Sequence, residues 1–201
     1  QHAAQQQGVH RVLLSIGYRG EQIQAYFGQR FDRVDLEYVV EDRPAGTGGA
    51  FRRGLSPHAP FTVSPDLLDK VCALSAEGHV PLAMHLAESM EELELLRSHS
   101  GLLVERLKQL EAWHPGQIPR GIRPLDYIEM LATAHQALII HGNFLGAEEM
   151  DFLAARRDRM SVVFCPRTHA YFPHGDYPLA EMLARGVRVA VGTDSRASNP
   201  D

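Results

Sequence analysis

Four segments of the sequence carry side chains that could bind a metal ion or move a proton. They contain His58, then His85 with Glu88 three residues later, then His141, and finally Asp194. Two imidazoles and a carboxylate are a partial ligand set for a zinc-like ion, which keeps one position for water in catalytic sites. Glu88 could transfer a proton beside such an ion without binding it. These residue types favour a metal site with a proton-transfer group next to it.

Each of these residues also has a structural interpretation. A histidine at a strand end, such as His58, is often only a hydrogen-bonded structural residue. Asp194 could cap a following helix, because Thr-Asp-Ser is good capping chemistry. Glu88 could begin a solvated helix, since three more glutamates follow it within six residues. The functional interpretation is favoured because all four segments carry polar groups where a predicted strand ends.

Short β-branched runs alternate with periodic stretches typical of helices, which predicts βαβ units and a parallel sheet. Ser64 and Pro65, for example, give the first helix a cap and a favourable first residue. The predicted strands are 12–16, 34–40, 51–55, 80–85, 137–141, 161–164 and 187–192. The predicted helices are 65–77, 90–96, 102–110, 124–133, 147–156 and 178–184.

Two α/β architectures fit this alternation, an open doubly wound sheet and a closed barrel. The chain lacks a Gly-rich phosphate-binding turn after its first strand, and Gly46-Thr-Gly-Gly49 is expected to be only a flexible connection. Polar residues follow one strand after another, as they do at the active sites of barrels. We therefore expect the α/β class and a partial (β/α)8 TIM-type barrel, because seven strands are found where a barrel has eight.

The composition excludes several classes of protein. The net charge is −5, and the 20 basic residues are scattered rather than clustered, so we expect no nucleic-acid partner. The longest apolar runs are far shorter than the roughly 20 residues of a membrane helix, so we expect no membrane partner. Two cysteines make no disulfide framework, and residues 1–7 lack a signal-peptide core. A reduced, cytoplasmic location is expected. The nucleophile turn of serine hydrolases, the His-Glu-x-x-His helix of metalloproteases and the Pro-Cys-x-x-Cys motif of cytidine deaminases are also absent.

Five ordered stretches resemble the amidohydrolase superfamily, in its branch of aminohydrolases and chlorohydrolases. They are residues 55–64, 85–89, 141–145, 164–172 and 186–200. The resemblance implies a (β/α)8 barrel, a small β-sandwich built from both chain ends, and one divalent metal ion, usually zinc and sometimes iron. By this resemblance the chain, residues 1–201, is one barrel domain that lacks the first strand and the β-sandwich.

The resemblance also implies roles for individual residues. His85 and Asp194 are metal ligands, Glu88 is the proton shuttle, and His141 hydrogen-bonds the metal-bound water or the substrate. The substrate contacts implied are His58, Arg167, His169 and Ser195. Arg167 and His169 belong to the segment 167–172, which would line the rim of the pocket. The family's further ligand pair, His-x-His, is missing, because His2 and His10 lie in the wrong context. We therefore expect the first strand upstream of Gln1.

The expected reaction is hydrolytic deamination of an aminopurine nucleoside-like or related heterocyclic substrate, with release of ammonia. In this scheme Asp194 accepts the proton of the attacking water and Glu88 protonates the ring nitrogen. The sequence Ser-Pro-His-Ala-Pro at 56–60 and the sequence His-Leu-Ala-Glu-Ser at 85–89 look closest to those of deaminases of adenosylhomocysteine and aminodeoxyfutalosine. The alternatives are a chlorohydrolase, a cyclic-amide hydrolase, and a barrel fragment without catalysis. Unpaired sheet edges predict aggregation or a homo-oligomer when residues 1–201 are expressed alone.

Overall fold

The computed structural model describes residues 11–16, 29–31, 34–40, 54–195 and 197–198. The chain forms two compact units, residues 1–53 and residues 54–201. The single domain expected for residues 1–201 stays a prediction. Four sequence features lie outside the described residues: most of the predicted strand 51–55, the Gly-rich loop 46–49, and the histidines His2 and His10.

The described part of the first unit is a small three-stranded sheet with the order β1-β3-β2. Strand β1 (Arg11–Ile16) is parallel to β3 (Val34–Val40), and both strands were predicted from their apolar runs. Strand β2 (Arg30–Phe31) is antiparallel to β3 and was not predicted, because two residues are too short to show a pattern.

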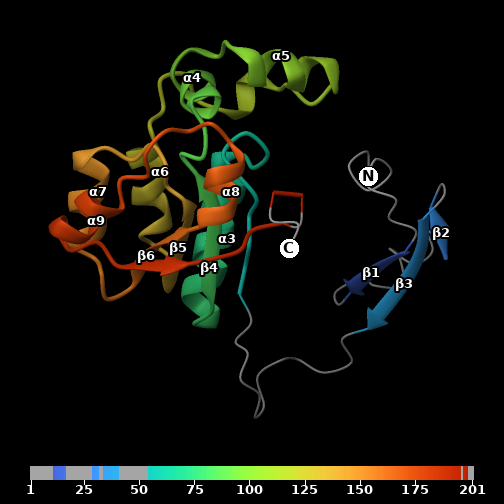
Figure 1. The fold of residues 1–201 in the computed structure, drawn as a ribbon, viewed down its shortest axis with the longest axis horizontal. Coiled ribbons are helices and arrows are strands. Elements are labelled where there is room, and N and C mark those ends of the chain that lie inside the picture. The colour runs from blue at the N-terminus through green and yellow to red at the C-terminus, as the bar shows by residue number, and fades with distance from the viewer. Residues whose placement is uncertain (1–10, 17–28, 32–33, 41–53, 196, 199–201) are drawn as a thin grey trace. The chain divides into compact units, whose positions relative to one another are not determined.

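The second unit contains a parallel sheet whose strands follow one another in chain order, β4-β5-β6-β7 (Figure 1). Leu55 extends this order by a parallel bridge to Leu82, where a further strand was predicted. The order never reverses, whereas a doubly wound sheet reverses at its ligand-binding crevice. The strands are β4 (Pro81–Leu86), β5 (Gln136–His141), β6 (Met160–Phe164) and β7 (Val189–Val191).

The helices between these strands also follow one another in space. Helices α3, α6, α7 and α9 pack neighbour on neighbour in that order, while α4 and α5 pack together at the top of the view in Figure 1. Such a row of helices is the outer layer expected of a barrel. The bounds are α3 (Pro65–Gly78), α4 (Met90–Ser98), α5 (Leu102–Gln109), η1 (Pro115–Gln117), α6 (Pro124–Leu131), α7 (Ala147–Ala154), α8 (Pro166–Tyr171) and α9 (Leu179–Arg185).

Most helix starts agree with the sequence prediction to within a residue. Ser64 caps α3, since its Oγ accepts a hydrogen bond from the Leu67 amide, and Pro65 is the first helical residue. Helix α8 was not predicted; its six residues are too few for a helical period to show. The last predicted strand, 187–192, is shorter in the structure, where β7 covers only Val189–Val191.

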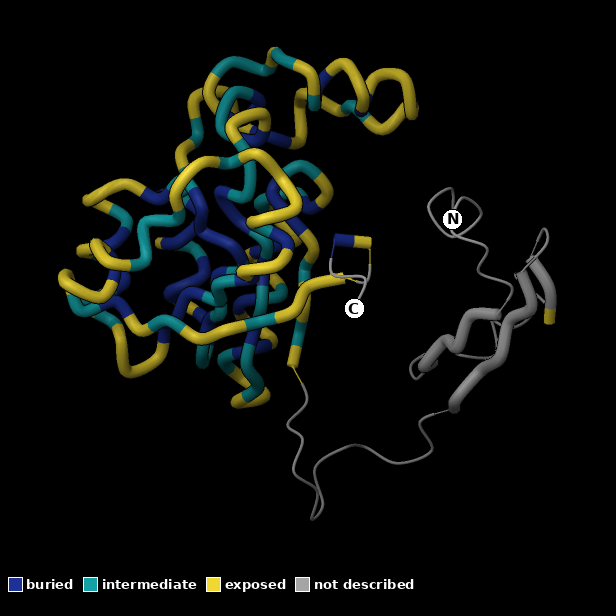
Figure 2. Tube along the Cα trace, in the orientation of Figure 1, coloured by how far each residue is buried: buried dark blue, intermediate teal, exposed yellow. Residues whose placement is uncertain are grey.

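The core lies between the sheet and its helices, where the buried residues gather in Figure 2. Alternate residues of β4, namely Leu82, Met84 and Leu86, are fully buried, and Ile139 of β5 lies opposite Met84 on the same face. Successive residues of a strand point to opposite faces, so the residues between these buried ones face the other side of the sheet, where a polar environment is possible. Among the described residues no helix has the length and apolar character needed to cross a membrane.

We predict that Ile139→Ala lowers the free energy of unfolding by about 2–5 kcal/mol, because it leaves a cavity in a closely packed core. Ile139 is fully buried. Leu74→Ala is the control, because Leu74 of α3 is 57% exposed and should cost less than about 1 kcal/mol. Urea unfolding measures both variants, and equal losses would contradict the assigned core.

Candidate metal centre

Three side chains from three strand ends meet in the second unit. His85 lies near the end of β4, His141 is the last residue of β5, and Asp194 follows β7. One ligand atom of each lies within 4.8 Å of the other two. The Nε2 atom of His85 is 3.9 Å from Oδ1 of Asp194, and Nε2 of His141 is 4.0 Å from Oδ2. The structure thus brings together His85 and Asp194, which are more than 100 positions apart in the sequence, with His141 from the segment between them.

The ring of His85 is oriented by the backbone of a neighbouring segment. Its Nδ1–H donates a hydrogen bond of 3.0 Å to the carbonyl oxygen of His58. The same carbonyl accepts the His85 amide at 2.9 Å, which places the two residues in register. Because a carbonyl can only accept, the proton of a neutral ring is on Nδ1, and the lone pair of Nε2 is available to a metal ion.

His141 is buried, with 2% of its surface exposed, and its Nε2 has no hydrogen-bond partner. Burial lowers its pKa to about 4, although the charge of Asp194 acts in the opposite direction. The imidazole is therefore neutral at pH 7. A buried nitrogen without a partner is costly unless some group satisfies it. A cation held between His85 and Asp194, or a water molecule beside that cation, would do so. The donor set of two imidazoles and a carboxylate fits a divalent ion such as zinc.

The carboxylate of Asp194 is held by two hydroxyl groups. Thr168 of α8 and Ser198 each donate to Oδ2, at 3.1 and 3.2 Å. Both hydroxyl-bearing residues are buried. They leave Oδ1 directed at His85, so they act on the orientation of a candidate ligand. Neither hydroxyl was predicted to hold Asp194, because neither residue stands at a spacing that indicates such a role, although Thr168 lies in the segment 167–172 predicted to line the pocket.

Glu88 lies beside the three candidate ligands. Its Oε1 atom is 3.5 Å from Nε2 of His141. Burial raises the pKa of Glu88, His85 opposes the rise, and Asp194 adds to it. Glu88 immediately precedes Ser89, the N-cap of α4, and therefore stands in the turn between β4 and that helix. A carboxyl group with a raised pKa in this place is suited to carry a proton.

The four predicted substrate contacts have different surroundings in the structure. His58 is near the site, with its ring 5.3 Å from that of His85, and burial followed by the charge of His85 lowers its pKa. His169 donates from Nε2 to the Gly175 carbonyl, 2.8 Å away, and its charge acts on the pKa of His141. Arg167 and Ser195 are exposed neighbours of Thr168 and Asp194.

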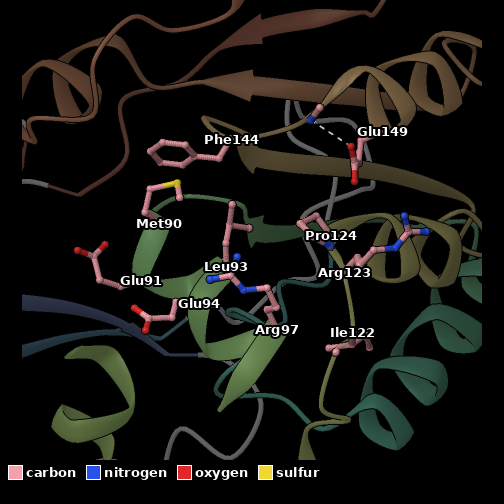
Figure 3. Close-up of a pocket in the computed structure, with 12 residues that line it drawn as sticks. Met90, Glu91, Leu93, Glu94, Arg97, Ile122, Arg123, Pro124, Phe144 and Glu149 are labelled. Carbon is pink, nitrogen blue, oxygen red and sulfur yellow. Dashed lines mark hydrogen bonds between the residues drawn. The ribbon is translucent and has the colours of Figure 1, made fainter. Parts of the chain in front are cut away.

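Two hollows lie near this site. One, of about 570 Å³, is lined by α4 and the segment 121–124, and it includes none of the three candidate ligands (Figure 3). The other, of about 550 Å³, includes Glu88 and the aromatic rings of Phe61, Phe144, Phe172 and His174. This second hollow, the aromatic groove, is the one within reach of the candidate centre. Phe172 ends the segment predicted to line the pocket, whereas Phe61 and Phe144 were not predicted.

Comparison with known proteins identifies the family. Residues 32–200 match the amidohydrolase family, and the chain therefore belongs to it. It is 33% identical over 156 residues to the aminodeoxyfutalosine deaminase of Deinococcus radiodurans, covering 73% of this chain and 36% of that protein. It is 30% identical over 195 residues to the 5-methylthioadenosine/S-adenosylhomocysteine deaminase of Halothermothrix orenii, covering 96% of this chain and 39% of that protein. The chain thus spans well under half the length of these relatives.

Solved structures show the same fold. The aminofutalosine deaminase of Helicobacter pylori in complex with methylthio-coformycin has a TM-score of 0.64 at 22% identity, covering 94% of this chain and 44% of that one. An adenosine deaminase from Xanthomonas campestris with bound zinc has a TM-score of 0.54 at 21% identity, covering 98% of this chain and 40% of that one. These neighbours are TIM-barrel proteins, so the predicted α/β class and partial barrel are confirmed.

We predict an energetic coupling between Thr168 and Asp194 of about 1 kcal/mol, the usual net contribution of a hydrogen bond. Thr168→Val removes the hydroxyl from Oδ2 of Asp194, and its cost should shrink by that amount when Asp194 is already alanine. Urea unfolding of the metal-free wild type, both single variants and the double variant measures the coupling. A value below about 0.3 kcal/mol would show that Thr168 does not hold the carboxylate.

Proposed function

We propose that the protein containing this chain is a metal-dependent deaminase that releases ammonia from an adenosine-like nucleoside. The observation that carries the proposal is the cluster of His85, His141 and Asp194, with Oε1 of Glu88 3.5 Å from Nε2 of His141. The two relatives above support the substrate class, since one is an aminodeoxyfutalosine deaminase and the other a 5-methylthioadenosine/S-adenosylhomocysteine deaminase.

Nε2 of His85 and Oδ1 of Asp194 would hold one divalent cation, zinc first and iron as the second choice, with Nε2 of His141 directed at the same place. When bound, such an ion lowers the pKa of a water molecule from its bulk value towards neutrality. His85 contributes a fixed tautomer, and Asp194 contributes a carboxylate that two hydroxyls keep in place. The family resemblance predicts two further ligands from a His-x-His pair, and this stays a prediction.

Proton transfer falls to the two carboxylates. Asp194 is the base for the proton of the attacking water. Glu88, whose pKa burial has raised, is suited to deliver a proton to the nitrogen of the substrate ring. The adjacent carbon then becomes more electrophilic and bonds to the oxygen of the water. Glu88, now deprotonated, takes the remaining hydroxyl proton and passes it to the amino group, which leaves as ammonia as the C–N bond breaks. The proton on Asp194 then restores Glu88. Neutral His141 would hydrogen-bond the water or the substrate from within the buried wall.

The aromatic groove would bind the part of the substrate that does not react, because Glu88 and several flat aromatic rings line it. His58, Arg167, His169 and Ser195 stay proposed substrate contacts around it. The protein is proposed to be cytoplasmic, in keeping with its free thiols at Cys72 and Cys165. The predicted homo-oligomer can be checked by light scattering.

We predict that Glu88→Gln in the full-length, metal-loaded enzyme lowers ammonia release by about 10²–10⁴-fold, because the amide cannot carry the proton. Bound metal should stay at the wild-type level, since Glu88 is not a proposed ligand. Assays of ammonia, chloride and ring opening on a panel of heterocycles measure the activity. Near-normal ammonia release by the variant would remove Glu88 from its assigned role, and chloride release by the wild type would favour a chlorohydrolase.

We predict that His85→Ala lowers bound zinc or iron from about one equivalent to below about a tenth, because each ligand of such a site is needed to compete with water. Chelation of the wild type should abolish ammonia release, and zinc should restore it. His114→Ala is the matched control, because His114 is an exposed histidine beside η1. Metal analysis of the purified proteins decides, and full metal content in His85→Ala would refute the centre.

A further inference from the structure

We propose that Glu92 and Asn143 are positioning residues that hold the turn carrying Glu88, and through it the place of the proton shuttle. The inference rests on the proposed function, because it takes Glu88 as the group that moves the proton. It concerns two buried polar side chains to which the proposed reaction gives no part. Both lie close to the candidate centre without belonging to it.

The carboxylate of Glu92 binds two successive backbone amides. Its Oε1 accepts the Ala87 amide and its Oε2 accepts the Glu88 amide, both at 2.9 Å. Glu92 is 2% exposed and stands in the first turn of α4. In a capping box the glutamate at this place bonds back to the N-cap residue, here Ser89. The Glu92 carboxylate interacts with the Ser89 backbone as well, but its two hydrogen bonds of 2.9 Å reach one and two residues further, into the turn itself.

Asn143 and its neighbour hold the other side of the turn. The Nδ2 group of Asn143 donates to the Glu88 carbonyl at 2.8 Å, and the Phe144 amide donates to the Ala87 carbonyl at 3.2 Å. Together with the two bonds to Glu92, every backbone polar group of Ala87 and Glu88 is therefore paired. Since Asn143 follows His141 by two residues, the bonds tie the end of β4 to the end of β5.

The turn needs this support because its backbone is strained. Ala87 has a φ of 52°, in the left-handed region that residues with a side chain avoid at a cost of about 1–2 kcal/mol. Strained residues persist where their surroundings hold them, and they concentrate at functional sites. The result of the strain is local: Glu88 leaves the strand direction and its Oε1 lies 3.5 Å from Nε2 of His141.

Capping of α4 alone does not explain Glu92. Ser89 already caps the helix, since its Oγ accepts the Glu92 amide at 3.2 Å. Burial of a carboxylate is expensive, and in keeping with that cost it raises the pKa of Glu92 to about 7. A costly buried group whose two oxygens both bind the amides of the shuttle turn is most simply explained by the need to hold that turn.

The first test is kinetic and uses the full-length, metal-loaded enzyme. Glu92→Gln keeps the size of the side chain but leaves one acceptor oxygen. The amides of Ala87 and Glu88 each need one, so one of them loses its partner. We expect kcat to fall about 10–100-fold, because displacement of a catalytic group by about 1 Å costs up to about 10²-fold. KM should change less than about threefold and bound metal should not change. In the Glu88→Gln background the same substitution should cost less than about twofold, because its effect passes through Glu88.

The second test reads the turn directly, without activity. Hydrogen exchange at the amides of Ala87 and Glu88 should be at least about tenfold faster in Glu92→Gln than in the wild type, because exchange requires the amide to open. Glu91→Gln is the matched control. Glu91 is the exposed carboxylate of the same helical turn, so the change makes the same substitution near the helix start without touching either amide. Its exchange at both amides should match the wild type.

Asn143→Ala provides a second variant if Glu92→Gln does not fold. It removes the bond to the Glu88 carbonyl and should lower kcat about threefold to tenfold with metal retained, and again only in the presence of Glu88. Unchanged exchange in both variants, or an equal loss of kcat with and without Glu88, would overturn the inference. Normal activity of Glu88→Gln alone would instead overturn the shuttle in the proposed function, and hydrogen exchange would still decide whether Glu92 holds the turn.

Discussion

The site depends on the register of one parallel sheet. Leu86 lies opposite His141, and Phe164 lies opposite Val191, so the carboxyl ends of β4, β5, β6 and β7 meet at one edge. Because the paired strands run in the same direction, their carboxyl ends lie at the same end of the sheet. Every group of the candidate centre stands within a few residues of this edge, although the segments are far apart in the sequence. A slip of one residue in any strand would turn its side chains to the other face.

Three of the six described non-glycine residues with a positive φ lie at the same end of the sheet, whereas the other three, His79, His99 and Glu111, follow helices. Ala87, His141 and Asp194 all have a positive φ, at 52°, 70° and 55°. His141 ends β5 in phase with the buried residues of that strand, and its ring lies 5.3 Å from the ring of His85. Each strained place has polar support: Glu92 at the first, the Tyr177 hydroxyl on the His141 carbonyl at the second, and the Thr168 and Ser198 hydroxyls at the third. The strain and its supports together set the directions of the reactive groups.

The charges of the site point to a cation. Glu88 and Asp194 are near enough for the charge of Asp194 to raise the pKa of Glu88, while burial keeps His141 neutral. Two acidic groups and an imidazole nitrogen without a partner are a costly combination in a partly buried place. A divalent ion among His85, His141 and Asp194 would lower that cost. The chain belongs to the amidohydrolase family, and the resemblance to that family predicted His85 and Asp194 as ligands.

The sequence by itself determined most of the elements and the candidate residues for the chemistry. Apolar runs and caps are local signals, so β4, β5, α3 and the polar residues after the strands could be predicted, and the barrel followed from where those residues fall. Only the tertiary structure decided which groups orient them. Glu92, Asn143, Thr168 and Ser198 look like ordinary helix or loop residues in the sequence, because their hydrogen bonds depend on chain segments brought together by folding. Helix α8 and the left-handed backbone at His141 were hidden for the same reason: the contacts that hold them are not local.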